Sequence, residues 1–184
     1  MKETKLCSSC GVEKTTQEFR TSDILNNNRH ICIACLSETR KKHRQTASGI
    51  LSVLKSSAKA RGLEFSLESP WFVAWWTEQS ETCCYCGISI QDFIELRKRI
   101  VSASTGEFPE TKYKKFFYRP AALKVSRMTI ERRDNSLGYS PSNIAKCCSL
   151  CNSLKGELFD EEEMLVISAE TRRDFHDILR KPNG

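Results

Sequence analysis

Residues 129–156, TIERRDNSLGYSPSNIAKCCSLCNSLKG, decide the fold that we expect for this chain. Apolar and polar residues alternate over residues 125–131, which predicts a strand, and the following RDNSLG is typical of a turn. A helix is expected to begin near Cys148 and to place Cys148 and Cys151 on one face of its first turn. Asn152 and Lys155 follow beside the helix N-terminus, which favours an anion such as phosphate. The stretch therefore predicts a β-hairpin and a helix around a cysteine pair.

The ten cysteines fall into four clusters, and each cluster contains a C-x-x-C pair. This spacing lets two thiolates bind one tetrahedral metal, so four pairs supply the ligands of two four-cysteine zinc sites. Pairing by order gives one site from Cys7, Cys10, Cys32 and Cys35 and a second from Cys83, Cys86, Cys148 and Cys151. Disulfides or redox dithiols are the alternative, but the chain shows no signal peptide and no long apolar run, which favours a reducing cytoplasm. Cys84 and Cys147 remain as buried free thiols or as replacements for a neighbouring ligand.

The composition predicts a small apolar core that zinc helps to stabilise. The chain has 184 residues, of which 39% are hydrophobic and 28% are charged, and this is lean for one large core. A net charge of +6 suits a polyanionic partner, although charge of this size also occurs in proteins that bind no nucleic acid. Charge alone therefore does not identify the partner.

The first unit is predicted to span residues 1–45, a four-cysteine zinc module that ends in a basic helix. We expect the helix to contact phosphates, and a solvated helix face is the alternative. Its cations are Arg40, Lys41, Lys42 and Arg44. Residues 46–62 are predicted to form a connecting helix, because apolar residues recur at helical intervals before Gly62.

The second unit is predicted to span residues 63–160, with an insertion at about residues 87–124. A helix should begin with Ser69 as N-cap and Pro70 at its first position, and its three tryptophans favour packing against the second zinc site over stacking on bases. Within the insertion, basic and aromatic residues alternate, which suits a nucleic-acid backbone or, equally, a half-buried hairpin. The basic residues are Lys112, Lys114, Lys115 and Arg119. Residues 161–184 should form a closing amphipathic helix with Asp160 as its N-cap.

On these motifs the chain resembles the HNH endonucleases with a ββα-metal core, in particular their phage-type members. The resemblance covers about residues 53–160, and its specific part is the order of the Gly-Tyr turn, Asn143, CxxCN and the trailing Lys-Gly. The N-terminal module resembles the zinc ribbon often found ahead of such cores. The resemblance implies an α+β fold in which a small zinc-stabilised ribbon precedes a treble-clef-like ββα-metal core with flanking helices.

The resemblance also implies the site residues. Glu131 would be the acidic residue that helps bind a catalytic divalent ion, Mg²⁺ or Mn²⁺, with Asn143 as a further ligand, and Asn152 would occupy the last motif position. The family's first histidine, its general base, falls at Arg132. Arginine cannot accept a proton, although it could hold a phosphate or stabilise developing negative charge. Metal-bound water with help from Asp134 or Tyr139 would be one substitute for the missing base.

The expected function is metal-dependent hydrolysis of DNA phosphodiesters by an HNH-type endonuclease with two structural zinc ions. The alternative is a catalytically inactive, zinc-containing DNA-binding protein on the same scaffold. A zinc nucleobase deaminase is disfavoured because its H-x-E or C-x-E arm with P-C-x-x-C is absent. Duplex DNA is the expected partner, contacted also by Arg133 and Lys155, with no membrane association. The expected location is the cytoplasm, that of a host cell if the protein is phage-encoded.

Overall fold

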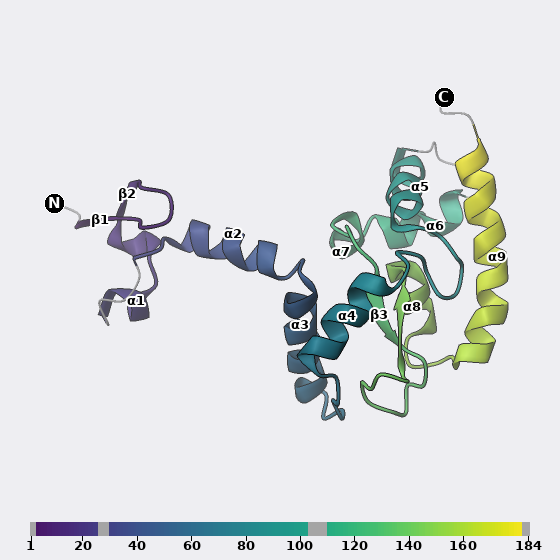
Figure 1. Ribbon diagram of the computed structural model, residues 1–184. Helices are drawn as coiled ribbons and strands as arrows, with labels where there is room; N and C mark the ends of the chain where they lie inside the picture. The colour runs from purple at the N-terminus through teal and green to yellow at the C-terminus, as the bar shows by residue number, and fades with distance from the viewer. Residues whose placement is uncertain (1–2, 26–29, 103–109, 182–184) are drawn as a thin grey trace.

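The computed structural model describes residues 3–25, 30–102 and 110–181. Its helices and strands, in chain order, are β1 (Thr4–Leu6), β2 (Glu13–Thr15), η1 (Thr16–Glu18), α1 (Thr21–Leu25), α2 (Ile33–His43), α3 (Ala47–Ala60), α4 (Ser69–Glu78), α5 (Ile90–Ser102), α6 (Glu110–Phe117), α7 (Pro120–Leu123), β3 (Thr129–Arg132), β4 (Ile144–Cys147), α8 (Ser149–Lys155) and α9 (Glu161–Arg180). β1 pairs with β2 and β3 with β4, both antiparallel, so the predicted α+β class is confirmed. Figure 1 shows β1, β2 and α1 at one end of α2, and α3 to α9 with the β3–β4 hairpin at its other end.

Three apolar clusters hold these elements together. The N-terminal cluster is centred on Cys7, Phe19 and Cys32, so two of its three buried residues are cysteines. A second cluster packs α3 and α4 against the β3–β4 hairpin. The third surrounds the second set of cysteines with α5, α6 and α9. Trp76 packs against both of these clusters, which confirms the predicted contact with the second zinc site for this tryptophan, whereas Trp71 is 37% exposed.

The insertion is helical, so the alternative of a half-buried hairpin is wrong. Tyr113 and Phe117 lie one turn apart on α6, and both are buried against the third cluster. The alternation of basic and aromatic residues is therefore the pattern of an amphipathic helix. Described residues form no helix long and apolar enough to cross a bilayer.

The helix ends follow local capping chemistry. Thr46 caps α3 by accepting a hydrogen bond from the Gly49 amide at 3.1 Å, so the helix begins at Ala47, at the start of the range predicted over residues 46–62. α4 begins one residue earlier than predicted, because Glu68 is its N-cap and Ser69 is its first residue. Asp160 caps α9 as predicted, in a reciprocal capping box with Glu163.

The β3–β4 hairpin positions the candidate site. β3 is shorter than the strand predicted over residues 125–131, and it pairs Glu131 with Ala145 and Arg132 with Ile144. Since neighbouring strand residues point to opposite faces, Ile130 packs against the α3–α4 cluster while Glu131 faces α8. A carboxylate is thus placed between the hairpin and the helix that follows it.

Candidate active site and metal centres

Two sets of four cysteines converge as predicted. The sulfur atoms of Cys7, Cys10, Cys32 and Cys35 lie within 4.8 Å of one another, and so do those of Cys83, Cys86, Cys148 and Cys151. Tetrahedral Zn–S bonds of about 2.3 Å place sulfur atoms about 3.8 Å apart. The Cys86 and Cys148 sulfurs, 3.9 Å apart, match that geometry, and all ten cysteines are free, so the disulfide alternative is not supported. Both clusters can hold zinc.

The two remaining cysteines differ in their surroundings. Cys147 is fully buried, as predicted, and its sulfur lies 3.7 Å from that of Cys83, so the second cluster has a fifth thiol beside it. Cys84 is exposed, which corrects the prediction that it is buried. Cys148 also acts as the N-cap of α8, because its sulfur accepts a hydrogen bond from the Cys151 amide at 3.4 Å. The second metal centre therefore fixes the start of α8.

Glu131 lies in a buried ion pair. Its carboxylate oxygen is 3.1 Å from the Lys155 Nζ, and the two side chains are 4% and 0% exposed. Lys155 also donates to the Arg132 carbonyl at 2.9 Å and to the Asn135 Oδ1 at 3.0 Å. Burial raises the pKa of Glu131, and the Lys155 ammonium opposes that rise. Lys155, predicted to contact a phosphate, is instead enclosed and bonded to the protein's own acceptors.

Arg132, at the position of the family's general base, faces the inside of the turn that follows β3. Its Nη1 donates to the carbonyls of Asn135 at 2.7 Å and Leu137 at 2.8 Å, and its Nη2 donates to Glu157 at 3.2 Å. The guanidinium also lies 5.7 Å from the centre of the Tyr139 ring. With these contacts Arg132 stabilises the turn.

Asn143 stabilises the same turn after β3 through side-chain hydrogen bonds. Its Oδ1 accepts from the Asp134 amide at 2.8 Å, while its Nδ2 donates to the carbonyls of Asp134 at 3.0 Å and Gly138 at 2.8 Å. The side chain is 4% exposed, so the structure does not present Asn143 as an open metal ligand. Asn152 differs, because its Nδ2 donates to Thr129 and to the Ile130 carbonyl while its Oδ1 has no hydrogen bond among the described residues.

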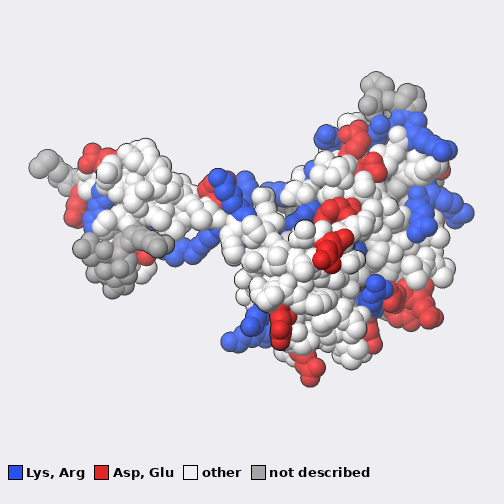
Figure 2. Space-filling model, viewed as in Figure 1, with Lys and Arg blue, Asp and Glu red and all other residues white. Residues whose placement is uncertain are grey.

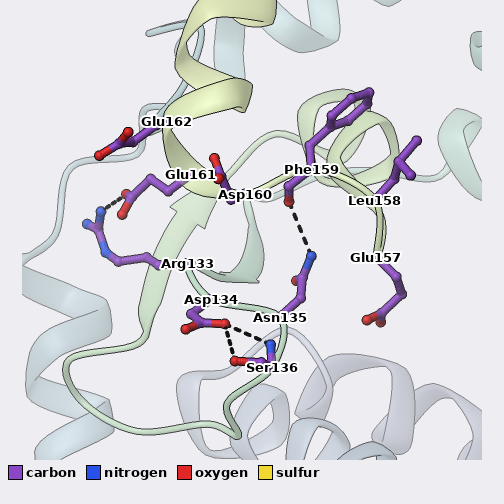
Figure 3. Close-up of a pocket in the computed structure, with 10 residues that line it drawn as sticks. All are labelled: Arg133, Asp134, Asn135, Ser136, Glu157, Leu158, Phe159, Asp160, Glu161 and Glu162. Carbon is purple, nitrogen blue, oxygen red and sulfur yellow. Dashed lines mark hydrogen bonds and ion pairs between the residues drawn. The ribbon is translucent and has the colours of Figure 1, made fainter.

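A pocket of about 490 Å³ lies between this turn and the first turn of α9 (Figure 3). Its acidic lining residues are Asp134, Glu157, Asp160, Glu161 and Glu162. Hydrogen bonds from the Ser136 hydroxyl and amide lower the pKa of Asp134, which keeps this carboxylate ionised. The pocket therefore repels phosphate, and no three of its acidic groups converge as metal ligands within the part of the chain that the structure describes.

The predicted nucleic-acid-binding residues divide into two groups. Arg133 forms an ion pair with Glu161, and Lys112 lies 2.5 Å from Glu170 and 3.0 Å from Asp174. The cations of α2 have no ion pair with any described residue. α2 is therefore the better candidate for contact with an external anion.

The sequence analysis missed the Glu131–Lys155 ion pair. A signal for it existed, because Lys155 follows the buried ligand Cys151 by four residues and so shares its helix face. The support that Asn135 and Glu157 give to this turn had no comparable signal, since it depends on contacts between the turn and the end of α8.

The β3–β4 hairpin followed by α8 forms the ββα arrangement that the motifs predicted, with the second cysteine cluster at the start of α8. A solved structure of the rare-cutting HNH restriction endonuclease PacI, described for its mechanism of DNA perturbation, is similar to this chain with a TM-score of 0.52. The two are 22% identical, and the similarity covers 94% of this chain and 96% of that one, which confirms the predicted fold. No family model and no curated protein matches the sequence.

Proposed function

We propose that this protein is a metal-dependent DNA endonuclease of the HNH type. The observation that carries the proposal is the placement of Glu131 on β3 opposite α8, which carries Asn152, in a chain whose fold matches that of an HNH restriction endonuclease. The proposed substrate, DNA, agrees with the unpaired cations of α2.

The donor set suits a hard divalent ion. Mg²⁺ is commonly bound through one or two carboxylates, with water and phosphate oxygens as its other ligands. Glu131 would supply the carboxylate and Asn152 its unbonded Oδ1. When bound, such an ion stabilises the charge that develops on the phosphate and on the leaving 3′ oxygen. Lys155 would have to release the Glu131 oxygen that it now contacts at 3.1 Å, so metal and ammonium compete for one carboxylate.

The general base of the proposed site is less clearly defined than its metal ligands. Arg132 stays protonated and is held by two carbonyls, so it cannot activate water. Of the two substitutes, the Tyr139 hydroxyl accepts a hydrogen bond from Arg61 at 2.7 Å and its side chain is buried. Asp134 is exposed and ionised, and we assign it the outer-sphere role.

A second candidate function is DNA binding without catalysis. The buried Glu131–Lys155 pair favours it, because an ammonium already neutralises the carboxylate that a metal would need. The arginine at the position of the base favours the same reading. This protein would use the HNH fold to hold DNA and leave its backbone intact.

Incubation with supercoiled plasmid and Mg²⁺ or Mn²⁺, with and without chelator, separates these functions. In an endonuclease we expect metal-dependent nicking that Glu131→Gln abolishes while zinc content and DNA binding persist. Glu162→Gln is the matched control, because Glu162 is an exposed acid on the nearby first turn of α9 with no ion pair among the described residues.

The Arg132→His variant distinguishes a protein that lacks only the general base from one that lacks a working catalytic site. If only the base is missing, the imidazole should create metal-dependent nicking in a protein that had none, since it can accept a proton near neutral pH. If the wild type and Arg132→His both bind DNA and both remain inert with every divalent metal tried, the endonuclease proposal is rejected in favour of the binding protein.

A further inference from the structure

We propose that a groove between α2 and the segment after α7 holds the phosphate backbone of duplex DNA. The groove has a volume of about 1110 Å³ and joins the N-terminal zinc module to the second unit. Its cationic lining residues are Arg20, Arg40, Lys41, Arg44, Lys124 and Arg127. The inference rests on DNA as the partner in the proposed function, and it assigns the surface that binds it.

The charge of the groove is uncompensated. None of its described lining residues is acidic, and none of the six cations forms an ion pair with any residue that the structure describes. Some cations elsewhere are paired, as Lys112 is with Glu170 and Lys146 with Glu81. Figure 2 shows Lys and Arg gathered over α2 where it meets the larger unit. Six unpaired cations around one hollow form a site for a polyanion.

One face of α2 forms a wall of the groove. Lining positions 33, 36, 37, 40, 41 and 44 recur at intervals of three and four, so they share a single helix face. Lys42 and Glu38 lie off that face and do not line the groove. The sequence analysis grouped Lys42 with its neighbours, whereas the structure separates it from them.

The opposite wall comes from residues 124–127, which no sequence motif had singled out. Lys124 is exposed, and Arg127 is half-buried with its Nη1 on the Met128 carbonyl at 3.2 Å. Burial lowers the pKa of Arg127, and the Glu81 carboxylate, which lies beyond ion-pair distance, opposes that shift only in part. A phosphate in the groove would supply the missing negative charge.

The uncharged part of the lining indicates how the groove binds. It contains Ser37, Gln45 and Ser126, whose side chains can donate hydrogen bonds, together with Ile33 and Leu36, and no aromatic ring among the described lining residues. Single-strand sites usually stack bases on aromatic side chains, whereas contacts to duplex backbone use cations and short polar donors. The groove therefore favours duplex backbone and carries little sequence preference.

The test measures binding of a labelled DNA duplex in chelator-free buffer without added divalent metal, from 50 to 200 mM salt. One variant per wall is used, Arg40→Gln with Arg44→Gln on α2 and Lys124→Gln with Arg127→Gln on the other side. The matched control, Lys55→Gln with Lys59→Gln, removes the same charge from exposed positions of α3 outside the groove. Zinc content and circular dichroism verify that each variant is folded.

Each groove variant should reduce the slope of log affinity against log salt by about 2, because each phosphate contact contributes about 0.9. Over this salt range that change is about tenfold in affinity. The control should keep the wild-type slope. If both groove variants keep the wild-type slope, or if the control loses as much slope as they do, the proposal that this groove binds DNA is refuted.

Together with the cleavage assay, these binding measurements test the groove proposal and the endonuclease proposal independently. A wild type that binds duplex through the groove but never cleaves with metal rejects the endonuclease and retains the groove. A wild type that cleaves while both groove variants bind as it does rejects the groove alone. Absence of duplex binding by the folded, zinc-loaded wild type rejects both.

Discussion

Replacing Lys155 by methionine should destabilise the protein strongly. Lys155 is fully buried and contacts the Glu131 carboxylate, the Arg132 carbonyl and the Asn135 side chain. Methionine fills the volume of the lysine stem but supplies no charge and no donor. Breaking a buried ion pair by removing one partner costs about 3–5 kcal/mol, because the other charge stays buried without compensation. We expect Lys155→Met to lower the free energy of unfolding at pH 7 by that amount.

A double variant tests whether the loss of stability in Lys155→Met comes from the unpaired Glu131 carboxylate. When Glu131→Gln accompanies Lys155→Met, neither charge of this pair remains, and exchange of a buried ion pair for neutral side chains is often nearly neutral. The double variant should therefore be more stable than Lys155→Met alone by about 2 kcal/mol or more. Lys98→Met, on the exposed surface of α5, is the control and should change stability by less than about 0.5 kcal/mol.

The loss of stability caused by Lys155→Met should also depend on pH. Burial already raises the pKa of Glu131 above that of the unfolded chain, and removal of Lys155 raises it further. A carboxyl whose pKa is raised by folding destabilises the folded state when ionised, above the folded pKa. As the pH falls from 7 through that pKa, Glu131 of the variant is protonated in the folded state before it is protonated in the unfolded state. The difference in unfolding free energy between wild type and variant should therefore narrow.

Denaturant unfolding followed by circular dichroism at fixed free zinc, at several values between pH 7 and pH 5, measures this gap. Zinc ligation is equally acid-sensitive in both proteins and cancels in the difference. A loss below about 1 kcal/mol at pH 7, or a gap that is constant with pH, would refute a buried charge pair at this position.

Three further results are expected. Elemental analysis should give two zinc ions per chain, and Cys151→Ser should reduce this to one; less than one in the wild type would contradict the metal architecture. Asn143→Ala should lower stability by about 2 kcal/mol in thermal unfolding and abolish cleavage with zinc retained, because three turn hydrogen bonds are lost; an unchanged midpoint would contradict this. Gly138→Ala should cost about 1–3 kcal/mol, since a Cβ there would overlap the Glu64 carbonyl, and a neutral effect in denaturant unfolding would argue against that close approach.

The fold could be predicted from the sequence where local chemistry determines it. Cysteine spacing predicted both metal centres, and the Gly-Tyr turn with the following cysteines predicted the hairpin and α8. Asp160 was sufficient to locate the start of α9. The helical insertion was harder, because aromatic and basic residues alternate in strands and helices alike over a short run.

The site was less predictable because its chemistry depends on distant partners. The motif positions identified Glu131 and Asn152 as candidate site residues, but they could not show that Lys155 forms an ion pair with the Glu131 carboxylate. Lys112 and Lys124 are both lysines of a kind usually exposed, yet Lys112 has two acidic partners from α9 and Lys124 has none among the residues that the structure describes. Which cations are free to bind DNA depends on where acidic residues of other elements fall in space.

If DNA binds the proposed groove, the position of α2 would make DNA affinity depend on the metal bound at the N-terminal cysteine cluster. The helix has 11 residues and no buried side chain, and isolated helices shorter than about 12–15 residues are marginal in water because nucleation is unfavourable. Its N-cap is Cys32 and its first turn contains Cys35, so coordination of zinc supplies that nucleation. When the N-terminal metal is removed, the helix–coil equilibrium of α2 should shift toward coil, and one wall of the basic groove would be lost while the second unit remained folded.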